Sequence, residues 1–346
     1  MAFNDKCRRP WMPVLLITLL AGGCAPPSDD FPVLEGPYLG QAPPGAEPQL
    51  FAPDIVSTGM YTRDVAMTPD GTEMFFGVQL GRFNTILETH IEDGRWTRPE
   101  VASFAQDSRF FNLEPAISPD GRRFFFLSTR VGPGREARAE QIRTWSNQDI
   151  WVMDRVDGGW SEPYDLGPPI NSEGAEFFPS VTRDGTLYFT RGSDDERESY
   201  IYRSRLVDGR YQEPEKLGPE VNSTPSQFNA FIAPDETYLI VCTERPDTRG
   251  GTDYYVVFRT AGDEWSEPVN LGDPVNTPGG AEYSPYVSPD GKYFFFMSAR
   301  RRPDATLPDT LTLDFLRRFR AGPESGNPAI YWIDAGFIDQ LRPEGW

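Results

Sequence analysis

Carboxylates at regular positions are the side chains of this 346-residue chain best suited to chemistry. Asp64, Glu114, Glu176 and Glu282 each lie six or eight residues before an aspartate that recurs along the sequence. Two carboxylates on either side of a sugar linkage can act as the acid and as the base or nucleophile of glycoside hydrolysis. The same groups can instead hold a ligand or a partner without reacting.

The single histidine restricts the other chemistries. One histidine cannot build a His-rich zinc site, an HExxH helix or a two-histidine mechanism. His90 also lies in residues 86–91, a predicted third strand away from the carboxylates, which argues against a serine hydrolase. We therefore expect no metal and no cofactor, and in the favoured interpretation no catalytic residue.

Polar side chains recur at the same two distances before each recurring aspartate. Eight residues before it stand Thr62, Asn112, Glu176, Gln227 and Glu282, and six before it stand Asp64, Glu114, Phe178, Asn229 and Ser284. Most of the residues between them are apolar, and such alternation places the polar set on one side of a strand. Pairing across the following turn puts Glu282 opposite residue 299, Asn112 opposite Thr129 and Gln227 opposite Glu244. An arginine follows each of these partners, so we expect Arg130, Arg245 and Arg300 near Glu114, Glu176 and Glu282, balancing their charge.

These residues form the predicted ligand-binding set, which consists of Asp64, Asn112, Glu114, Arg130, Glu176, Gln227, Arg245, Glu282 and Arg300. The alternative is structural. Polar groups at strand starts can simply solvate a channel or hydrogen-bond neighbouring sheets.

The elements that carry these side chains come from an internal repeat. Thr68-Pro69-Asp70-Gly71 recurs around Asp120, Asp184, Asp235 and Asp290. An aromatic strand follows each copy, then a third strand, and then segments such as Trp265-Ser266-Glu267-Pro268. Asp-Gly between apolar runs predicts a hairpin. Each unit is therefore a four-stranded antiparallel sheet, and sheets repeated at this period arrange radially as blades.

The two ends of the repeat predict how the ring closes. The last unit has only three strands, and residues 47–51 resemble an outer strand. We therefore predict an all-β fold, a five-bladed β-propeller over residues 48–334 closed by the N-terminal strand. A tail follows at residues 335–346.

The repeat residues resemble TolB-like β-propeller repeats of bacterial envelope proteins. The resemblance rests on Ser118-Pro119-Asp120-Gly121, the aromatic strand, Ser298-x-Arg300 and the Trp265 segment leading to Leu271-Gly272, and it covers residues 48–334. It implies a binding protein that contacts outer-membrane or peptidoglycan-associated assemblies. Five-bladed propellers also resemble carbohydrate-cleaving folds, which implies the glycoside-processing alternative.

The N-terminus predicts export. Residues 1–23 combine a basic start with an apolar run too short to cross a bilayer. Leu20-Ala21-Gly22-Gly23-Cys24 resembles a lipobox, with Ala21 where leucine is usual, so we predict lipidation at Cys24; an ordinary cleaved signal is the alternative. The proline-rich residues 24–47 read as an extended tether. The expected location is the outer membrane, facing the periplasm or the cell surface.

The net charge of the chain argues against two further classes of partner. With 52 acidic against 33 basic residues, the net charge of -19 argues against nucleic-acid binding and against adsorption to anionic lipid. We thus expect contact with the membrane through the lipid anchor only, and a monomer. A predicted helix at residues 309–320, with Leu311, Phe315, Leu316 and Phe319 on one stripe, should pack across the channel mouth.

The predicted function is a non-enzymatic exported lipoprotein. Its propeller would bind a protein, a peptide or a glycan at the channel mouth, at the starts of the innermost strands. The alternative is a glycoside-processing enzyme that uses Asp64, Glu114, Glu176 or Glu282 as paired carboxylates.

Overall fold

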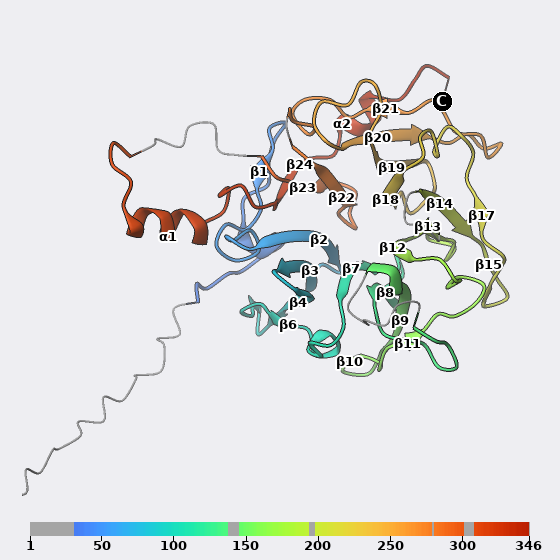
Figure 1. Cartoon of the computed structure of the whole chain (residues 1–346), viewed down its shortest axis with the longest axis horizontal. Coiled ribbons are helices and arrows are strands. Elements are labelled where there is room, and N and C mark those ends of the chain that lie inside the picture. Colours follow the sequence, from blue (N-terminus) through green and yellow to red (C-terminus); the bar gives the residue numbers. More distant parts are fainter. Residues whose placement is uncertain (1–30, 138–144, 194–197, 279, 301–307, 346) are drawn as a thin grey trace, which may run out of the picture. The chain divides into compact units, whose positions relative to one another are not determined.

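The computed structural model describes residues 31–137, 145–193, 198–278, 280–300 and 308–345. The predicted signal peptide, Cys24 and the first part of the predicted tether lie outside these residues. The described strands form a five-bladed β-propeller, in which β2, β7, β12, β18 and β22 surround the centre (Figure 1). The predicted fold class and the predicted number of blades are confirmed.

Each blade is an antiparallel sheet that runs outward from one innermost strand. Blade 1 comprises β2 (Tyr61–Met67), β3 (Glu73–Leu80), β4 (Phe83–Glu92), β5 (Arg95–Trp96) and β6 (Glu100–Val101). Blade 2 comprises β7 (Asn112–Ile117), β8 (Arg123–Ser128), β9 (Asp149–Val156), β10 (Gly159–Trp160) and β11 (Tyr164–Asp165). Blade 3 comprises β12 (Glu176–Val181), β13 (Leu187–Gly192), β14 (Ser199–Ser204) and β17 (Glu215–Lys216), beside a hairpin of β15 (Leu206–Val207) and β16 (Arg210–Tyr211).

The last two blades follow the same plan. Blade 4 comprises β18 (Gln227–Ile232), β19 (Tyr238–Thr243), β20 (Asp253–Phe258) and β21 (Val269–Asn270). Blade 5 comprises β22 (Glu282–Val287), β23 (Tyr293–Ser298), β24 (Ala329–Asp334) and β1 (Gln49–Leu50). The helical elements are η1 (Tyr38–Gly40), η2 (Ser103–Ala105), η3 (Trp145–Asn147), α1 (Leu313–Ala321) and α2 (Phe337–Gln340).

The N-terminal strand closes the ring, as predicted. In β1, Gln49 pairs with Trp332 and Leu50 with Tyr331 of β24. Phe51, which follows, is fully buried with its ring centroid 5.0 Å from that of Phe295. The first and last blades are therefore joined by backbone pairing and by aromatic packing.

The recurring turn is built by its own side chains. The Ser118 hydroxyl donates to Oδ1 of Asp120 at 2.6 Å, and the backbone N–H of Arg122 donates to the same oxygen at 3.0 Å. Gly121 has a φ of +71°, which a glycine adopts without strain. The Ser-Pro-Asp-Gly pattern is thus a local requirement of the hairpin, which explains its recurrence without any function.

A second recurring residue fastens the connection that leaves each of three blades to the third strand of that blade. The Asn276 side chain accepts from the backbone N–H of Tyr254 at 2.9 Å and donates to the carbonyl of the same residue at 3.0 Å. Asn171 bonds Ile150 in the same way, and Asn222 bonds Ile201. Each side-chain amide thus makes the two hydrogen bonds to the third strand that the backbone of a neighbouring strand residue would make.

The innermost strands carry a bulge that the sequence did not predict. The pairing of β22 with β23 shifts between Tyr283 and Tyr286, so Glu282 faces Ser298 rather than residue 299. The same one-residue shift places Asn112 opposite Ser128 and Gln227 opposite Thr243. An extra residue in one strand displaces every pair beyond it by one. The predicted register was therefore wrong by one residue at the strand starts.

The predicted tether packs on the propeller over its second half. Leu39 is buried, and the Tyr38 ring lies 5.1 Å from that of Tyr293 and 5.5 Å from that of Trp332. The Trp96 indole N–H donates to the carbonyl of Gly36 at 2.8 Å. The side chains of Tyr38 and Leu39 are sufficient to bind this segment to the propeller. The prediction of an extended tether over residues 24–47 is therefore wrong for this part.

The C-terminal residues are also ordered against the core. In α2, Ile338 is 2% exposed and belongs to the apolar cluster of blades 4 and 5. Helix α1, in contrast, is less buried than the prediction expected. It starts after Thr312, whose hydroxyl caps the N–H of Phe315, ends at Gly322 as predicted, and buries none of its residues. It does not pack across the mouth.

Closure of the ring gives a first prediction. Phe51→Ala should lower the free energy of unfolding by about 3–5 kcal/mol, because it removes a fully buried ring between blades 5 and 1. Urea unfolding followed by circular dichroism measures the change. Val207→Ala, at a half-exposed site in β15, is the control and should change little. A loss below about 1 kcal/mol for Phe51→Ala would contradict the role of this junction.

Candidate functional site

The bulged residues meet on the axis of the ring. Each innermost strand places a non-glycine residue with positive φ at the sixth position before the turn aspartate, and these are Asp64, Glu114, Phe178, Asn229 and Ser284, with φ values of 53°, 58°, 51°, 51° and 66°. Left-handed backbone is costly for such residues and persists only where the surroundings impose it. The structure brings together Asp64 and Glu114, two residues of the predicted set.

The bulge turns backbone N–H groups toward the neighbouring blade. The N–H of Glu114 donates to Oδ2 of Asp64 at 3.2 Å, and the N–H of Phe178 donates to Oε2 of Glu114 at 2.7 Å. The N–H of Asn229 donates to the Thr190 hydroxyl at 3.1 Å. At these three junctions the left-handed residue of one blade is thus held by a side chain of the preceding blade.

Arg63 is the cation at the centre. Its Nε lies 3.0 Å from Asp64, and its Nη2 lies 2.6 Å from Oε1 of Glu114 and 3.4 Å from the Ser284 hydroxyl. The same hydroxyl accepts from Nδ2 of Asn229 at 3.2 Å, and the guanidinium lies 4.9 Å from the Tyr283 ring centroid. The guanidinium therefore joins blades 1, 2 and 5, and the Ser284 hydroxyl extends the network to blade 4.

The axial network is buried and contains more carboxyl groups than cations. Arg63, Asp64 and Glu114 are 7%, 3% and 4% exposed, and one cation faces two carboxyl groups. Burial raises the pKa of Glu114 to about 7, although Arg63 opposes the shift. Breaking a buried pair typically costs about 3–5 kcal/mol, so Arg63 is required to keep both carboxylates at the axis.

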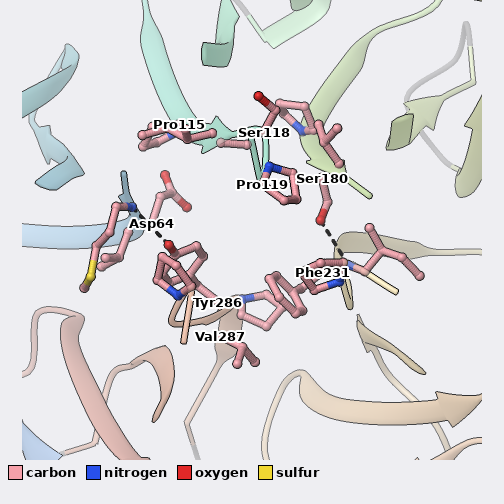
Figure 2. Close-up of a pocket in the computed structure, with 18 of the residues that line it drawn as sticks. Asp64, Pro115, Ser118, Pro119, Ser180, Phe231, Tyr286 and Val287 are labelled. Carbon is pink, nitrogen blue, oxygen red and sulfur yellow. Dashed lines mark hydrogen bonds between the residues drawn. The ribbon is translucent and has the colours of Figure 1, made fainter. Parts of the chain in front are cut away.

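A cavity of about 170 Å³ opens from this network toward the hairpin turns. Figure 2 shows Asp64, Pro119, Ser180, Phe231 and Tyr286 around it. The Tyr286 hydroxyl accepts from the N–H of Met67 at 3.0 Å, and the Ser180 hydroxyl accepts from the N–H of Ile232 at 3.0 Å (Figure 2). We call this cavity the turn-side funnel.

The chemistry of the funnel changes along its length. Its walls are mostly apolar and include Pro115, Pro179, Pro285, Phe231 and Val287. Its inner end is formed by Asp64, Glu114 and Ser284, and Arg183 lies at the level of the turns. The funnel can therefore surround an apolar stem and present carboxylates to its tip.

A wider groove adjoins the funnel on the same face. It has a volume of about 770 Å³ and shares Met67, Pro69 and Pro289 with the funnel. Its other lining includes Glu35, Gln41, Asp70, Asp290 and Lys292, so acidic groups outnumber basic ones. The packed residues 35–43 form one of its walls, and the groove therefore depends on the segment that the sequence assigned to a tether.

The mouth at the strand starts is a separate and more open cavity. It has a volume of about 260 Å³ and is lined by Arg63, Glu114, Trp145, Gln148, Phe177, Phe228, Asn229 and Tyr283. Four of these residues, Arg63, Phe177, Phe228 and Tyr283, stand at the seventh position before the turn aspartate, and none stands at the eighth. The sequence predicted the polar residues of the eighth position here, and that assignment was wrong.

The residues of the eighth position serve their own blades. Oε1 of Glu282 accepts from the Thr277 hydroxyl at 2.5 Å and from the Ser298 hydroxyl at 3.0 Å. Glu176 accepts from Ser172 and, at 2.8 Å, from Nε of Arg191. Asn112 accepts from the Ser128 hydroxyl at 3.0 Å, and Gln227 donates to the carbonyl of Thr224 at 2.6 Å. All four side chains are fully buried, and they fasten the start of the innermost strand.

The three predicted arginines also lie away from the axis. Arg130 donates to Asn112 at 2.5 Å, and Arg300 donates to the carbonyl of Val275 at 2.7 Å. Arg245 lies over the Tyr255 ring, 5.5 Å from its centroid. None of the three makes a described ion pair with Glu114, Glu176 or Glu282, because the bulge shifts the strand starts by one residue.

Two features of the site escaped the sequence analysis although signals existed. Arg63 is a charged residue at the seventh position, where Leu113, Phe177, Phe228 and Tyr283 are apolar. One charged residue among equivalent apolar positions indicates that this side chain has a charged partner inside the ring. Three of the prolines that line the funnel, Pro115, Pro179 and Pro285, likewise recur at the fifth position, but a proline in a strand does not indicate which side faces the channel.

Metal chemistry finds no support among the described residues. Within the described ranges, no group of three or more His, Cys, Asp or Glu side chains could hold a metal ion. His90 lies in β4 of blade 1, and the cavity that it lines is distinct from the funnel and the mouth. In the part of the chain that the structure describes, no helix has the length and apolar character that a bilayer span requires.

Comparison with known proteins gives only distant similarities. No family model and no curated protein matches the sequence. TolB from Acinetobacter baumannii aligns at 15% identity over 79% of this chain and 57% of that structure, less than two thirds of its length, with a TM-score of 0.43. A GH62 hydrolase in complex with xylotriose aligns at 9% identity over 81% and 91%, with a TM-score of 0.44. The periplasmic gluconolactonase PpgL of Pseudomonas aeruginosa aligns at 13% identity over 68% and 64%, with a TM-score of 0.39.

The buried carboxyl group at the axis predicts a pH dependence of stability. The folded protein holds the Glu114 proton more tightly than the unfolded chain, so ionisation costs stability, and the free energy of unfolding should fall as pH rises from 4.5 to about 7. The contribution is at most one proton, about 1.4 kcal/mol per pH unit. Glu114→Gln should remove it, as urea titrations across this range would measure.

A matched control distinguishes the effect of Glu114 from that of the other carboxyl groups. Glu213→Gln removes one exposed carboxylate and should leave the slope unchanged. A Glu114→Gln protein with the same slope as the parent would contradict the elevated pKa.

Proposed function

We propose that the protein is a non-catalytic binding propeller of the cell envelope, which takes a basic side chain of a polypeptide partner into the turn-side funnel. One observation carries the proposal: a narrow, mostly apolar cavity ends at two buried carboxyl groups that share a single arginine. A lysine or arginine offers the complementary order, an apolar stem followed by a cation.

The size of the funnel favours one side chain over a larger ligand. Its volume of about 170 Å³ lies below the roughly 300–1,000 Å³ of pockets for small organic ligands. The adjoining groove, at about 770 Å³, has room for the backbone and neighbouring residues of a peptide. A peptide lying in the groove with one side chain in the funnel uses both spaces.

Charge supports the same class of partner. The funnel has two acidic groups at its inner end against Arg63 there and Arg183 at the turns, and the groove adds Glu35, Asp70 and Asp290 against Lys292, so acidic groups still outnumber basic ones. Hydrogen bonds from Ser288 and Lys292 outweigh burial and lower the pKa of Asp290, so this carboxylate is ionised at neutral pH. A chain of net charge -19 also attracts basic segments from a distance.

The envelope location rests on the sequence. The export signal at residues 1–23 and the lipobox-like Leu20-Ala21-Gly22-Gly23-Cys24 support transport and lipidation. A protein fixed to a membrane by Cys24 would present its funnel to partners in the periplasm or at the cell surface.

Glycoside processing is the second candidate, since Glu114 has a raised pKa beside Asp64 and such a pair could supply an acid and a nucleophile. The hydrogen bonds of the pair oppose it. Both oxygens of Glu114 accept from Arg63 or the N–H of Phe178, and Asp64 accepts from Arg63 and the N–H of Glu114. Carboxyl groups whose oxygens are all engaged by the protein are held in place, which disfavours their attack on a sugar.

Peptide selection tests the proposal. A display library of random peptides panned on the protein should enrich lysine or arginine flanked by apolar residues. Ala116→Lys places an ammonium group of the protein's own in the funnel, and it should weaken the enriched peptides by about tenfold or more. Fluorescence anisotropy with a labelled peptide measures the affinity.

Val207→Lys adds the same group at a half-exposed site outside the funnel and should bind as the parent does. Thermal melts establish that both variants are folded. Enriched peptides without a basic residue, or equal binding by Ala116→Lys, would sink the proposal.

The enzyme candidate has its own measurement. The purified protein should release no reducing sugar from arabinoxylan or from peptidoglycan fragments, and Glu114→Gln should match it. Release by the parent that Glu114→Gln abolishes would replace the binding proposal with glycoside hydrolysis.

A further inference from the structure

Helix α1 is exposed to an unusual degree for an apolar segment. Leu313, Leu316 and Phe319 are 61%, 49% and 43% exposed, and Leu311 before the helix is 65% exposed. No residue of the helix is buried. By contrast α2, which is shorter, buries Ile338 in the core, so the chain does pack a helix where a partner surface exists.

The helix is fixed to the propeller at its C-terminal end. The N–H of Gly59 donates to the carbonyl of Ala321 at 3.0 Å, and the Asn327 side chain donates to the carbonyl of Gly59 at 2.7 Å. A Cβ at residue 59 would lie 2.2 Å from the carbonyl oxygen of Arg320, so only glycine permits this contact. The helix is therefore held in place without its apolar face being used.

The exposed face combines apolar and basic groups. Phe315, Leu316 and Phe319 share one side at helical spacing, and the rings of Phe315 and Phe319 stack with centroids 5.9 Å apart. Arg318 and Arg320 flank that side, and Arg317 has a side chain that is 71% exposed. Three arginines against Asp314 make this helix basic within a chain of net charge -19.

The apolar and basic composition of this helix face indicates which class of partner it can bind. A second copy would bring the same arginines together, and like charges oppose such a contact. Nucleic acid would satisfy the arginines but would leave three large apolar side chains unburied. An anionic phospholipid surface offers both phosphates and acyl chains, and basic amphipathic helices of this kind lie in that layer.

We propose that α1 is an interfacial helix that docks on anionic phospholipid, with Phe315, Leu316 and Phe319 toward the acyl chains and the arginines at the phosphates. The proposal is independent of the peptide-binding proposal. It revises the expectation that the membrane is contacted through the lipid anchor only, because net charge describes the whole chain whereas adsorption depends on the charge within a Debye length of the surface.

Vesicle binding tests the inference. The chain from residue 24 with Cys24→Ser, which carries no lipid, should sediment with vesicles of phosphatidylglycerol and phosphatidylethanolamine but not with vesicles of phosphatidylcholine alone. Phe319→Glu, and separately Arg318→Gln with Arg320→Gln, should reduce the bound fraction about tenfold at equal lipid. Added salt should weaken binding of the parent.

The control and a second readout keep the outcome clear. Val207→Glu introduces the same charge at another half-exposed apolar site and should bind as the parent does. Phe319→Trp should show a blue-shifted emission on the anionic vesicles, which reports burial of that side chain directly. No sedimentation of the parent, sedimentation unaffected by the helix substitutions, or a dimer that Phe319→Glu dissociates would overturn the inference.

Discussion

A single left-handed residue in each innermost strand organises the centre of this propeller. At this residue the backbone leaves the extended conformation, and the innermost strand gains one residue relative to the second strand of the blade. The five residues are Asp64, Glu114, Phe178, Asn229 and Ser284. Where the partner is described, the freed N–H bonds a side chain of the preceding blade, as Glu114 does with Asp64. At Glu114, Phe178 and Asn229 an interblade bond offsets the strain of the bulge, and the register and the axial network follow from the bulges.

The axial network separates two spaces of different chemistry. On the side of the strand starts the wall is aromatic and open, whereas on the side of the turns it is narrow, rich in proline and closed by carboxyl groups. Arg63 holds Asp64 and Glu114 in this position, since two buried carboxylates without a cation would repel each other. The same ion pairs engage the carboxylate oxygens, which supports the proposed binding role over the glycoside-processing candidate.

Sequence patterns predicted the fold well, but they did not predict where most of the polar side chains at the strand starts lie. The turn aspartates, the recurring asparagines and the strand at residues 47–51 act through local hydrogen bonds and strand pairing, so their spacing was sufficient to give five blades and their closure. Of the nine predicted ligand residues, only Asp64 and Glu114 lie at the axis. Glu176, Gln227 and Glu282 show the same polarity and spacing but fasten loops within their own blades, because alternation along a strand does not say which side faces the channel once a bulge intervenes.

The sequence alone determined what depends on neighbours along the chain. Hairpin turns, strand alternation and the end of α1 at Gly322 are settled by a few adjacent residues, whose backbone preferences and hydrogen bonds are local. Tertiary structure decided what depends on residues far apart: the meeting of Arg63 with Glu114, the packing of Tyr38 on Trp332, and the exposure of α1. Burial and charge pairing arise only when distant segments share one space, and a one-residue bulge is enough to change which of them meet.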